Sequence, residues 1–594
     1  MINPAGAQPA QTLEARLAFE KDTARLLDEI ALLEKKLWQP MAGEDILATY
    51  QEKFRQLETL YSNSPADKRY SFRVVIPVAD RPQHLRQCLY SLKKLCESYH
   101  YGGYIDGRYP KIAVLVADDS SDPDNIRQNR NLCSEMSTAG IQTDYFGLDE
   151  QLQLAHEYGE QSGLANIIGD LSGIKQATDF SHKGASIMRN ISYLKLKQIV
   201  NDNTLVYFID SDQEFCVNTA ERERYYALNF FHYLDYLFRS QDIRLLTGKV
   251  VGDPPVSPAV MAANFQQDVL AFLQQQATLD PNAACCFHRR DTTDAGNNLP
   301  DDAAYHDMAA LFGFSQKQAS FRYRCRLQGR HSNGDCLADF SDKLQHFFYG
   351  EHPTRKTFFQ YGNGLDETVA ARTVYTGNYV CTVDALDYFI PFASLKLRMA
   401  GPVLGRLLKS KLKQAFVSAN LPMLHTRTVE DTGRSEFRPG VENRLQQVSL
   451  ETEFIRQFYG DIMLFAMEKI TASGFPEAAV DEAFVETTLR ETYENIRQNY
   501  QEKHDTILQL KNTIDRLFGQ PEHWWHRDEY STAAGNFHRF LQNIQLNFDD
   551  DTRAFQSIVS PGPAQQQLAM IQQAILRYPE DCKQWAKALA QGSL

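Results

Sequence analysis

The segment LVYFIDSD at residues 205–212 joins an uninterrupted apolar run to two aspartates one residue apart. An apolar run of this length predicts a strand buried on both faces of a sheet. Open α/β sheets bind ligands at the carboxyl ends of their strands, where Asp210 and Asp212 lie. Since alternate residues of an extended chain share a face, both carboxylates can reach one divalent cation, and oxygen ligands favour Mg²⁺ or Mn²⁺. An isolated Asp-x-Asp is more often a solvated strand end, so the surrounding sequence decides the interpretation.

Strand and helix patterns alternate along the chain before this segment. The expected order is a strand at 72–78, a helix at 82–97, a strand at 111–117, a helix at 124–140, a strand at 141–146 and a helix at 185–200. Strands that alternate with helices predict a mainly parallel sheet with right-handed crossovers. The fold class is therefore α/β, with a Rossmann-like central domain.

Helical patterns flank this central region on both sides. We expect a polar tail at 1–12, a helical hairpin within 1–69 and a helical domain at 439–594. The central domain, 70–438, divides into halves at 70–215 and 216–438. The second half is expected to contain helices at 221–239, 261–276 and 395–415, strands at 244–251 and 373–383, and an irregular insertion or lid at 280–350. The hairpin either packs on the central domain or serves oligomerisation, and packing is the simpler interpretation.

Composition narrows the class of protein. The 594 residues carry a formal net charge of −13, which argues against nucleic-acid binding and against attachment to anionic membranes. No transmembrane segment is evident, and residues 1–17 lack the basic and apolar regions of a signal peptide, so a cytoplasmic protein is expected. The ten cysteines include no Cys-x-x-Cys pair, and the spacing in Cys285-Cys286-Phe287-His288 does not match a zinc site. Reduced, buried thiols are the simpler expectation.

Four pieces of the first half, taken together and in order, resemble a known family. They are VVIPVADRP at 74–82, VLVADDSSD at 114–122, KGASIMRN at 183–190 and VYFIDSD at 206–212. The set resembles the nucleotide-binding half of GT-A-fold glycosyltransferases, most closely those of the family-2 type. The resemblance implies a GT-A fold, a nucleotide-sugar donor such as a UDP- or GDP-sugar, and Mn²⁺ or Mg²⁺ as cofactor.

The resemblance also implies which residues bind the donor and the metal. The expected donor-binding residues are Pro77, Arg81, Asp118, Asp119, Lys183, Arg189, Asp210 and Ser211. One of the two acids at 118–119 is expected to accept a hydrogen bond from the base or ribose, the alternative being a capped turn. The cations could meet phosphate or stay solvated at the surface. The metal ligands are expected to be Asp210, Asp212 and His425, the last at the position where such enzymes often carry a third ligand.

The second half departs from the family pattern. TGNYV at 376–380 looks like the start of the acceptor region, but Gly401-Pro402 stand where a Glu-Asp pair with the general base is expected, and no acid occurs from 388 to 429. Inverting transfer needs a base to deprotonate the acceptor. The base could come from Asp253, Glu351, Asp366 or Glu367; the reaction could be retaining; or activity could be lost.

The acceptor and the rival functions stay open at this stage. Lys249, Arg355 and Arg398 are candidates for contacting a small or anionic acceptor, against the simpler reading of a solvated basic surface. One rival is a nucleotidyltransferase, although no Gly-rich loop follows the first strand. The other is a catalytically silent scaffold that uses its helical flanks to assemble partners or a homo-oligomer.

Overall fold

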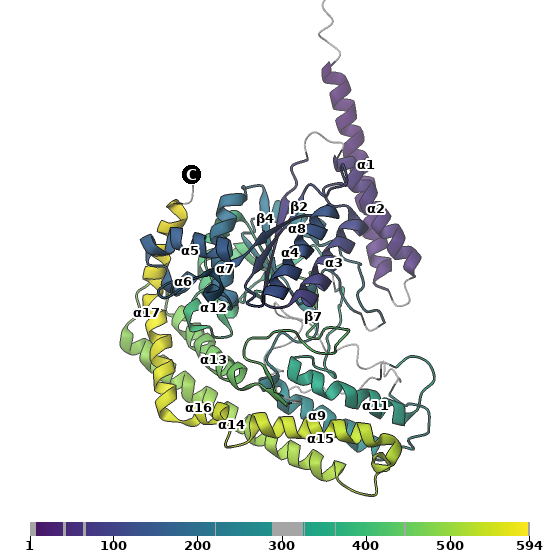
Figure 1. The fold of residues 1–594 in the computed structure, drawn as a ribbon. Coiled ribbons are helices and arrows are strands. Elements are labelled where there is room, and N and C mark those ends of the chain that lie inside the picture. The colour runs from purple at the N-terminus through teal and green to yellow at the C-terminus, as the bar shows by residue number, and fades with distance from the viewer. Residues whose placement is uncertain are drawn as a thin grey trace, which may run out of the picture.

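The computed structural model describes residues 8–39, 43–62, 67–219, 221–287, 325, 327–362, 364–444 and 447–591. A mixed α/β core lies between an N-terminal helical hairpin and an arc of C-terminal helices (Figure 1). The expected helical flanks are therefore present. Within the described ranges, no helix combines the length and the apolar character that a bilayer span requires.

An eight-stranded sheet forms the core, in the order β3-β2-β1-β4-β9-β6-β10-β8. Its strands are β1 (Ser71–Val78), β2 (Ile112–Asp118), β3 (Gln142–Phe146), β4 (Thr204–Ile209), β6 (Leu245–Thr247), β8 (Thr368–Ala370), β9 (Asn378–Cys381) and β10 (Phe416–Ala419). All run in one direction except β8 and β9, which are antiparallel to their neighbours. The sheet is thus mostly parallel, as predicted. The connections reverse direction between β1 and β4, and this topological switch point is where open α/β sheets form their ligand crevice.

Both faces of the sheet are buried, as the apolar strand runs predict. Val74 and Val114 belong to one hydrophobic cluster and Val75 and Leu115 to the other, because side chains alternate along a strand. The first cluster includes side chains of α3 (Pro82–Tyr99), α4 (Pro123–Thr138) and α8 (Phe230–Ser240). The second includes side chains of α5 (Leu148–Ser162), α6 (Ala165–Ile168), α7 (Ala185–Ile199), α9 (Pro258–Gln276) and α12 (Ala400–Leu412).

A small second sheet lies beside the carboxyl end of β4. It has the order β5-β11-β7, with β5 at Gln213–Glu214, β11 at Met423–His425 and β7 at Val250–Gly252. His425 pairs with Gln213 on one side and with Gly252 on the other. These pairings bring three distant segments of the chain to the switch point.

The N-terminal hairpin packs on the central region. Its helices are α1 (Gln8–Leu37) and α2 (Glu44–Ser62), and Tyr50 and Phe54 of α2 make edge contacts with Tyr99 of α3 at 6.2 and 5.4 Å between ring centroids. Apolar residues at helical spacing on α2 are therefore buried against α3, which is the simpler of the two interpretations of the hairpin.

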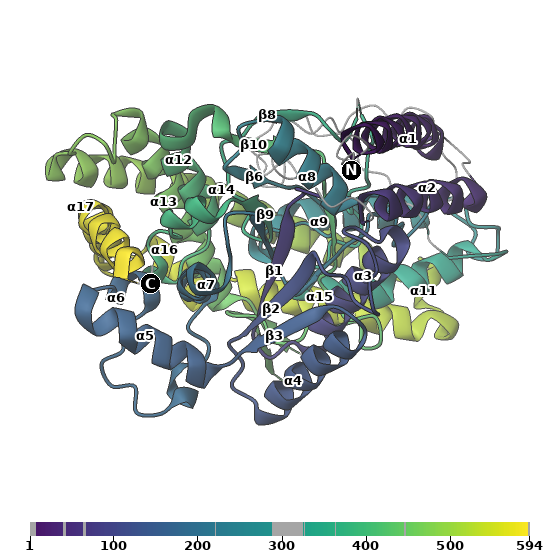
Figure 2. The same ribbon diagram turned by 90° about the horizontal axis from the view of Figure 1, so that it is seen from above.

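The C-terminal helices continue the hydrophobic core and lie across the sheet from the hairpin (Figure 2). They are α13 (Glu451–Ala472), α14 (Glu482–Phe518), α15 (Ser531–Phe548), α16 (Arg553–Val559) and α17 (Pro561–Gln591), preceded by the hairpin of β12 (Glu442–Arg444) and β13 (Gln447–Ser449). The last helix returns to the central region, where Trp585 Nε1 donates to the Leu386 carbonyl at 3.2 Å.

Several expected elements differ in the structure. The helix expected at 221–239 begins at Phe230, because Asn229 caps it by accepting from the His232 amide. The strand expected at 244–251 divides at Gly248 into β6 and β7, which belong to different sheets. The expected strand at 373–383 is reduced to β9, and the expected tail becomes helical from Gln8. The expected insertion at 280–350 contains α11 (Asn333–Lys343), while residues 288–324 and 1–7 lie outside the described residues.

Candidate functional site

The loops that follow β1 and β4 meet at the switch point. Arg81, the residue before α3, donates from Nη1 to Asp212 Oδ2 at 3.0 Å. Its Nε atom donates to the Phe437 carbonyl at 2.6 Å. Two of the four motif pieces, far apart in sequence, therefore contact each other through this ion pair.

Asp212 and His425 face each other because β5 and β11 are paired. The Thr426 amide donates to the Asp212 carbonyl at 3.0 Å, and His425 Nε2 lies 3.7 Å from Asp212 Oδ1. His425 Nδ1 donates to the Asp253 carbonyl at 2.7 Å, and this hydrogen bond holds the ring with Nε2 towards the carboxylate. Asp212 Oδ1 is buried and accepts no hydrogen bond from any described residue. This donor pair fits a divalent cation.

Positive charge surrounds the Asp212 carboxylate. Arg427 Nη1 lies 3.4 Å from Oδ2, the same oxygen that Arg81 contacts. Burial raises the pKa of Asp212, but His425, Arg81 and Arg427 lower it more, so the pKa lies well below its ordinary value. Asp212 is therefore ionised throughout the physiological range, as a metal ligand must be.

Asp210 is held by a different partner. Its side chain is 36% exposed and forms an ion pair with Arg189 Nη2, which also donates to the Thr376 carbonyl at 3.1 Å. Among the described residues, Asp210, Asp212 and His425 do not form a set of ligand atoms that all lie within 4.8 Å of one another. Arg189, in the first turns of α7, thus orients Asp210 beside the Asp212–His425 pair.

The two acids after β2 have different environments. Asp118 accepts from the Ser120 amide, Asn129 Nδ2 and the Tyr145 hydroxyl, each at 2.9 Å, and burial raises its pKa. It therefore ties β2 to α4 and β3. Asp119 forms a buried ion pair with Lys183, whose pKa is lowered by burial. Asp119 also accepts from the Gly184 amide at 3.3 Å, so it joins the second and third motif pieces.

The other two expected donor residues lie within the same framework. Pro77 is in β1 opposite Ala117, and Ser211 is buried between the two aspartates. The Pro77 ring has no donor or acceptor, and the Ser211 hydroxyl makes no hydrogen bond to another described residue, so neither side chain indicates a specific role.

The segment 426–440 crosses from β11 to the start of α3. Glu436 accepts from the Gln83 amide at 3.1 Å and the His84 amide at 2.9 Å, so its carboxylate caps the N-terminus of α3. Phe437 stacks on His182 with ring centroids 4.2 Å apart and 10° between their planes. Sequence reasoning missed Arg427 and this segment; its only signal was an arginine two residues after His425.

One of the expected base candidates lies directly beside His425. Asp253 follows β7, and its Oδ2 accepts from the Arg427 amide at 3.0 Å. Lys356 Nζ lies 3.4 Å from Asp253 Oδ1 and 2.9 Å from Glu351 Oε1. Burial raises the pKa of Asp253, whereas Lys356 and His346 overcome the effect of burial on Glu351 and lower its pKa. Asp253 is therefore the group whose environment favours holding a proton.

The remaining expected residues are placed elsewhere or paired. Asp366 and Glu367 are exposed just before β8, at the sheet edge farthest from β3. Arg355 is bound to Asp268 at 2.8 and 2.9 Å, and Arg398 to Glu453 at 2.7 Å. Lys249 is buried beside the break between β6 and β7.

The structure explains why no acid stands at 401–402. A Cβ on Gly401 would lie 2.5 Å from the Val374 carbonyl oxygen, and one on Gly405 would lie 2.5 Å from Thr373 Cα. The start of α12 therefore packs directly on backbone and leaves no space for a carboxylate at 401.

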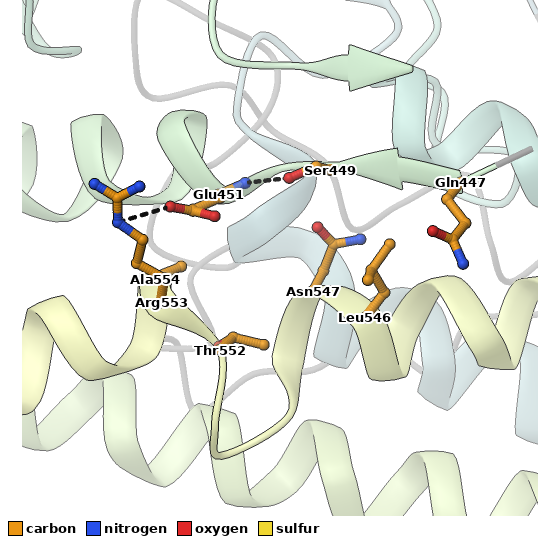
Figure 3. A pocket seen from close by; sticks show the side chains of 8 residues that line it. All are labelled: Gln447, Ser449, Glu451, Leu546, Asn547, Thr552, Arg553 and Ala554. Carbon is orange, nitrogen blue, oxygen red and sulfur yellow. Dashed lines mark hydrogen bonds and ion pairs between the residues drawn. The ribbon is translucent and has the colours of Figure 1, made fainter. Parts of the chain in front are cut away.

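A cavity of about 160 Å³ lies in the C-terminal region, between β13 and the helices α15 and α16 (Figure 3). Arg553 and Glu451 form an ion pair of 3.4 Å along its wall. Its lining includes none of the motif residues, so we do not assign the candidate chemistry to it.

No protein-family model and no curated protein matches this sequence. Among solved structures, the chain is similar to a mannosyltransferase from Pyrobaculum calidifontis in complex with GDP-Man and Mn²⁺. The TM-score is 0.30 and the identity 8%, over 85% of this chain and 98% of the mannosyltransferase. A likeness this distant assigns neither fold family nor activity.

Proposed function

We propose that this protein is a metal-dependent glycosyltransferase with a GT-A-like central region that uses a UDP- or GDP-sugar as donor. The observation that carries the proposal is the pair of Asp212 and His425 at the topological switch point. A buried, ionised carboxylate with an oxygen that lacks a hydrogen bond from described residues faces the Nε2 atom of an imidazole whose Nδ1 donates to a backbone carbonyl. That arrangement suits a cation better than it suits a purely structural ion pair.

The proposed metal ligands are Asp212, His425 and Asp210, with Mn²⁺ or Mg²⁺ as the ion. When bound, the ion would neutralise the charge that develops on the leaving diphosphate. Arg81 and Arg427 both reach Asp212 Oδ2 and are placed to contact phosphate oxygens beside it. Arg189 orients Asp210.

The nucleoside would lie towards the end of β2. Of the two acids there, Asp118 already accepts hydrogen bonds from Ser120, Asn129 and Tyr145. We therefore assign nucleoside recognition to Asp119, whose orientation is fixed by Lys183. This assignment agrees with the expectation that one acid of the pair is functional.

Asp253 is the proposed general base for the acceptor hydroxyl. It lies next to the proposed metal ligand His425, its pKa is raised by burial, and it follows a strand that also borders the switch-point site. Glu351 forms an ion pair with Lys356, the same cation that lies beside Asp253. Base catalysis by Asp253 predicts inversion at the anomeric carbon.

Calorimetry with UDP and GDP, with and without Mn²⁺ or Mg²⁺, tests the proposal. We expect nucleotide binding only in the presence of the metal. A wild-type protein that binds neither nucleotide under any of these conditions contradicts the transferase assignment. Binding without hydrolysis or transfer from any UDP- or GDP-sugar would instead identify a silent scaffold.

The role of Asp253 has its own test. Asp253→Asn should keep metal-dependent nucleotide binding and lose transfer, because only the acceptor step needs the base. Asp366→Asn, at an exposed position, is the matched control and should keep both. A product with retained anomeric configuration would exclude the base assignment while leaving the metal and donor assignments intact.

A further inference from the structure

Three cysteines from separate segments come together beside α11. Cys285 precedes residues 288–324, Cys325 follows them, and Cys336 lies in the first turns of α11. Their sulfur atoms all lie within 4.8 Å of one another. No other group of three potential metal ligands meets this distance in the part of the chain that the structure describes.

A histidine lies beside one of the three cysteines. His331 Nε2 lies 3.2 Å from Cys325 Sγ. Its other ring nitrogen, Nδ1, lies 3.0 Å from the Gly329 carbonyl, which places the proton on Nδ1 and the Nε2 lone pair towards the sulfur. A backbone acceptor on the far nitrogen is the usual partner of a metal-bound histidine.

Hydrogen bonds that do not involve the four proposed ligand side chains hold these segments in place. The Cys285 amide donates to the His331 carbonyl at 3.0 Å, and the Cys325 amide to the Phe287 carbonyl at 3.3 Å. Ser332 caps α11 in a reciprocal capping box with Asp335, and the Cys336 amide donates to the Ser332 carbonyl at 3.1 Å. The ligand-bearing segments are therefore preorganised.

The separations suit a tetrahedral ion. With Zn–S bonds of about 2.3 Å and a Zn–N bond of about 2.0 Å, ideal tetrahedral geometry puts sulfur atoms ~3.8 Å apart and sulfur and nitrogen ~3.5 Å apart. The three sulfur atoms lie within 4.8 Å of one another, and Cys325 Sγ lies 3.2 Å from His331 Nε2, so the cluster can contract onto one ion by small side-chain movements. A single disulfide would join only two of the three cysteines and would not explain why the third thiol and the imidazole lie beside them.

We infer that Cys285, Cys325, Cys336 and His331 form a structural zinc site of the Cys3His type. The ion would join the two chain segments on either side of residues 288–324 to the start of α11. That helix packs on the core through Phe340, whose ring lies 4.3 Å from that of Phe272 in α9. Sequence spacing around Cys285-Cys286-Phe287-His288 gave no indication of the site, because its other ligands are distant in sequence; His288 lies outside the described residues.

Zinc content per chain, measured by elemental analysis on full-length protein after dialysis against metal-free buffer, tests the inference. We expect one equivalent in the wild type and none in Cys325→Ser or Cys336→Ser. Cys286→Ser is the matched control, since Cys286 neighbours Cys285 but does not belong to the cluster, and it should retain one equivalent. Asp212→Asn should also retain it, which separates this site from the switch-point site.

Cobalt substitution of the wild type provides a second readout if a serine variant fails to fold. Co²⁺ should give the intense thiolate-to-metal charge-transfer absorption of a tetrahedral sulfur site, and zinc should displace it. A wild type that holds no zinc after incubation with Zn²⁺ and reductant would overturn the inference. So would a full equivalent of zinc in Cys325→Ser, or a disulfide between two of the three cysteines in freshly prepared protein.

Discussion

Replacing Asp212 with asparagine tests the central claim about the switch-point site. The substitution keeps the shape of the side chain and removes its charge. Asp212 is 5% exposed and lies 3.0 Å from Arg81, 3.4 Å from Arg427 and 3.7 Å from His425. Removing one partner of a buried ion pair costs roughly 3–5 kcal/mol, because the other charge stays buried. Both arginines keep some contact with solvent, so we expect a loss of about 3 kcal/mol in the free energy of unfolding.

The effect on binding should be larger than the effect on stability. Outer partners of metal ligands are worth about 10–100-fold in metal affinity, and removal of a ligand should cost at least as much as the upper end of that range. Calorimetry with Mn²⁺ and UDP or GDP measures this loss directly. Urea unfolding in metal-free buffer measures the stability separately.

The pH dependence follows from the lowered pKa of Asp212. A carboxyl group whose folded pKa is depressed contributes stability that is fully present above its unfolded pKa of about 3.9 and is lost as the pH falls through the folded value. The difference in unfolding free energy between wild type and Asp212→Asn should therefore stay constant from about pH 5 to 8. It should narrow below about pH 4.

Glu214→Gln is the matched control for Asp212→Asn. Glu214 is also buried and lies in β5, but its carboxylate is bound by Arg224, at 2.7 and 3.0 Å, and not by Arg81 or Arg427. We expect this variant to lose similar stability and to keep metal-dependent nucleotide binding. If both variants bind nucleotide with Mn²⁺ as the wild type does, Asp212 is a structural ion-pair residue and the reasoning about the site is refuted.

Three further predictions concern residues around this site and in the C-terminal helices. Gly377→Ala should weaken Mn²⁺-dependent nucleotide binding in calorimetry and lower the melting temperature, because the new Cβ would clash with buried Gln213 Nε2 and lie 2.7 Å from Asp210 Oδ2; unchanged binding would contradict this. Glu436→Gln should lower the unfolding free energy by about 1 kcal/mol in urea titrations, since a carboxylate at the N-terminus of α3 is replaced by a neutral amide; equal midpoints would argue against the cap. Burial raises the pKa of Asp461 to about 7. Between about pH 4 and 7 the carboxyl ionises only in the unfolded state, so the free energy of unfolding falls as the pH rises through this range. Asp461→Asn should therefore stabilise the protein by up to about 4 kcal/mol at pH 8 and by little at pH 4, and pH-independent unfolding curves for the pair would exclude this.

The parts of the fold that the sequence predicted are those with local signals. The apolar runs at 72–78, 111–117 and 205–209 became β1, β2 and β4, because strand period and burial are encoded in consecutive residues. The break at Gly248 was not predictable from the run 244–251. The break is accompanied by a hydrogen bond from a distant residue: the side-chain Nδ2 of Asn378 donates to the Lys249 carbonyl at 2.8 Å.

The sequence indicated the candidate residues that follow a strand, but not those that only tertiary packing brings to the site. Asp212 follows an apolar run, and His425 was proposed from the order of motifs in the family that the sequence resembles. Arg427 and Glu436 act only because the segment 426–440 crosses to α3, and no periodic pattern encodes that crossing. The cysteine cluster was missed for the same physical reason, since its ligands belong to segments brought together by backbone pairing.

The close packing at α12 connects the missing acid pair to the rest of the site. Gly401 and Gly405 let this helix approach residues 372–374 so closely that its first turns contact backbone. The neighbouring Arg398 is bound to buried Glu453, which also accepts from Arg438 at 2.7 Å. The position expected to supply a base is therefore used for packing and for a buried charge network. A proton from an acceptor must then be taken by a carboxylate on another element. Of the four acids that the sequence offered, Asp253 directly follows β7, which pairs with β11, and its amide donates to the His425 carbonyl at 2.9 Å, so it lies beside the proposed metal ligands.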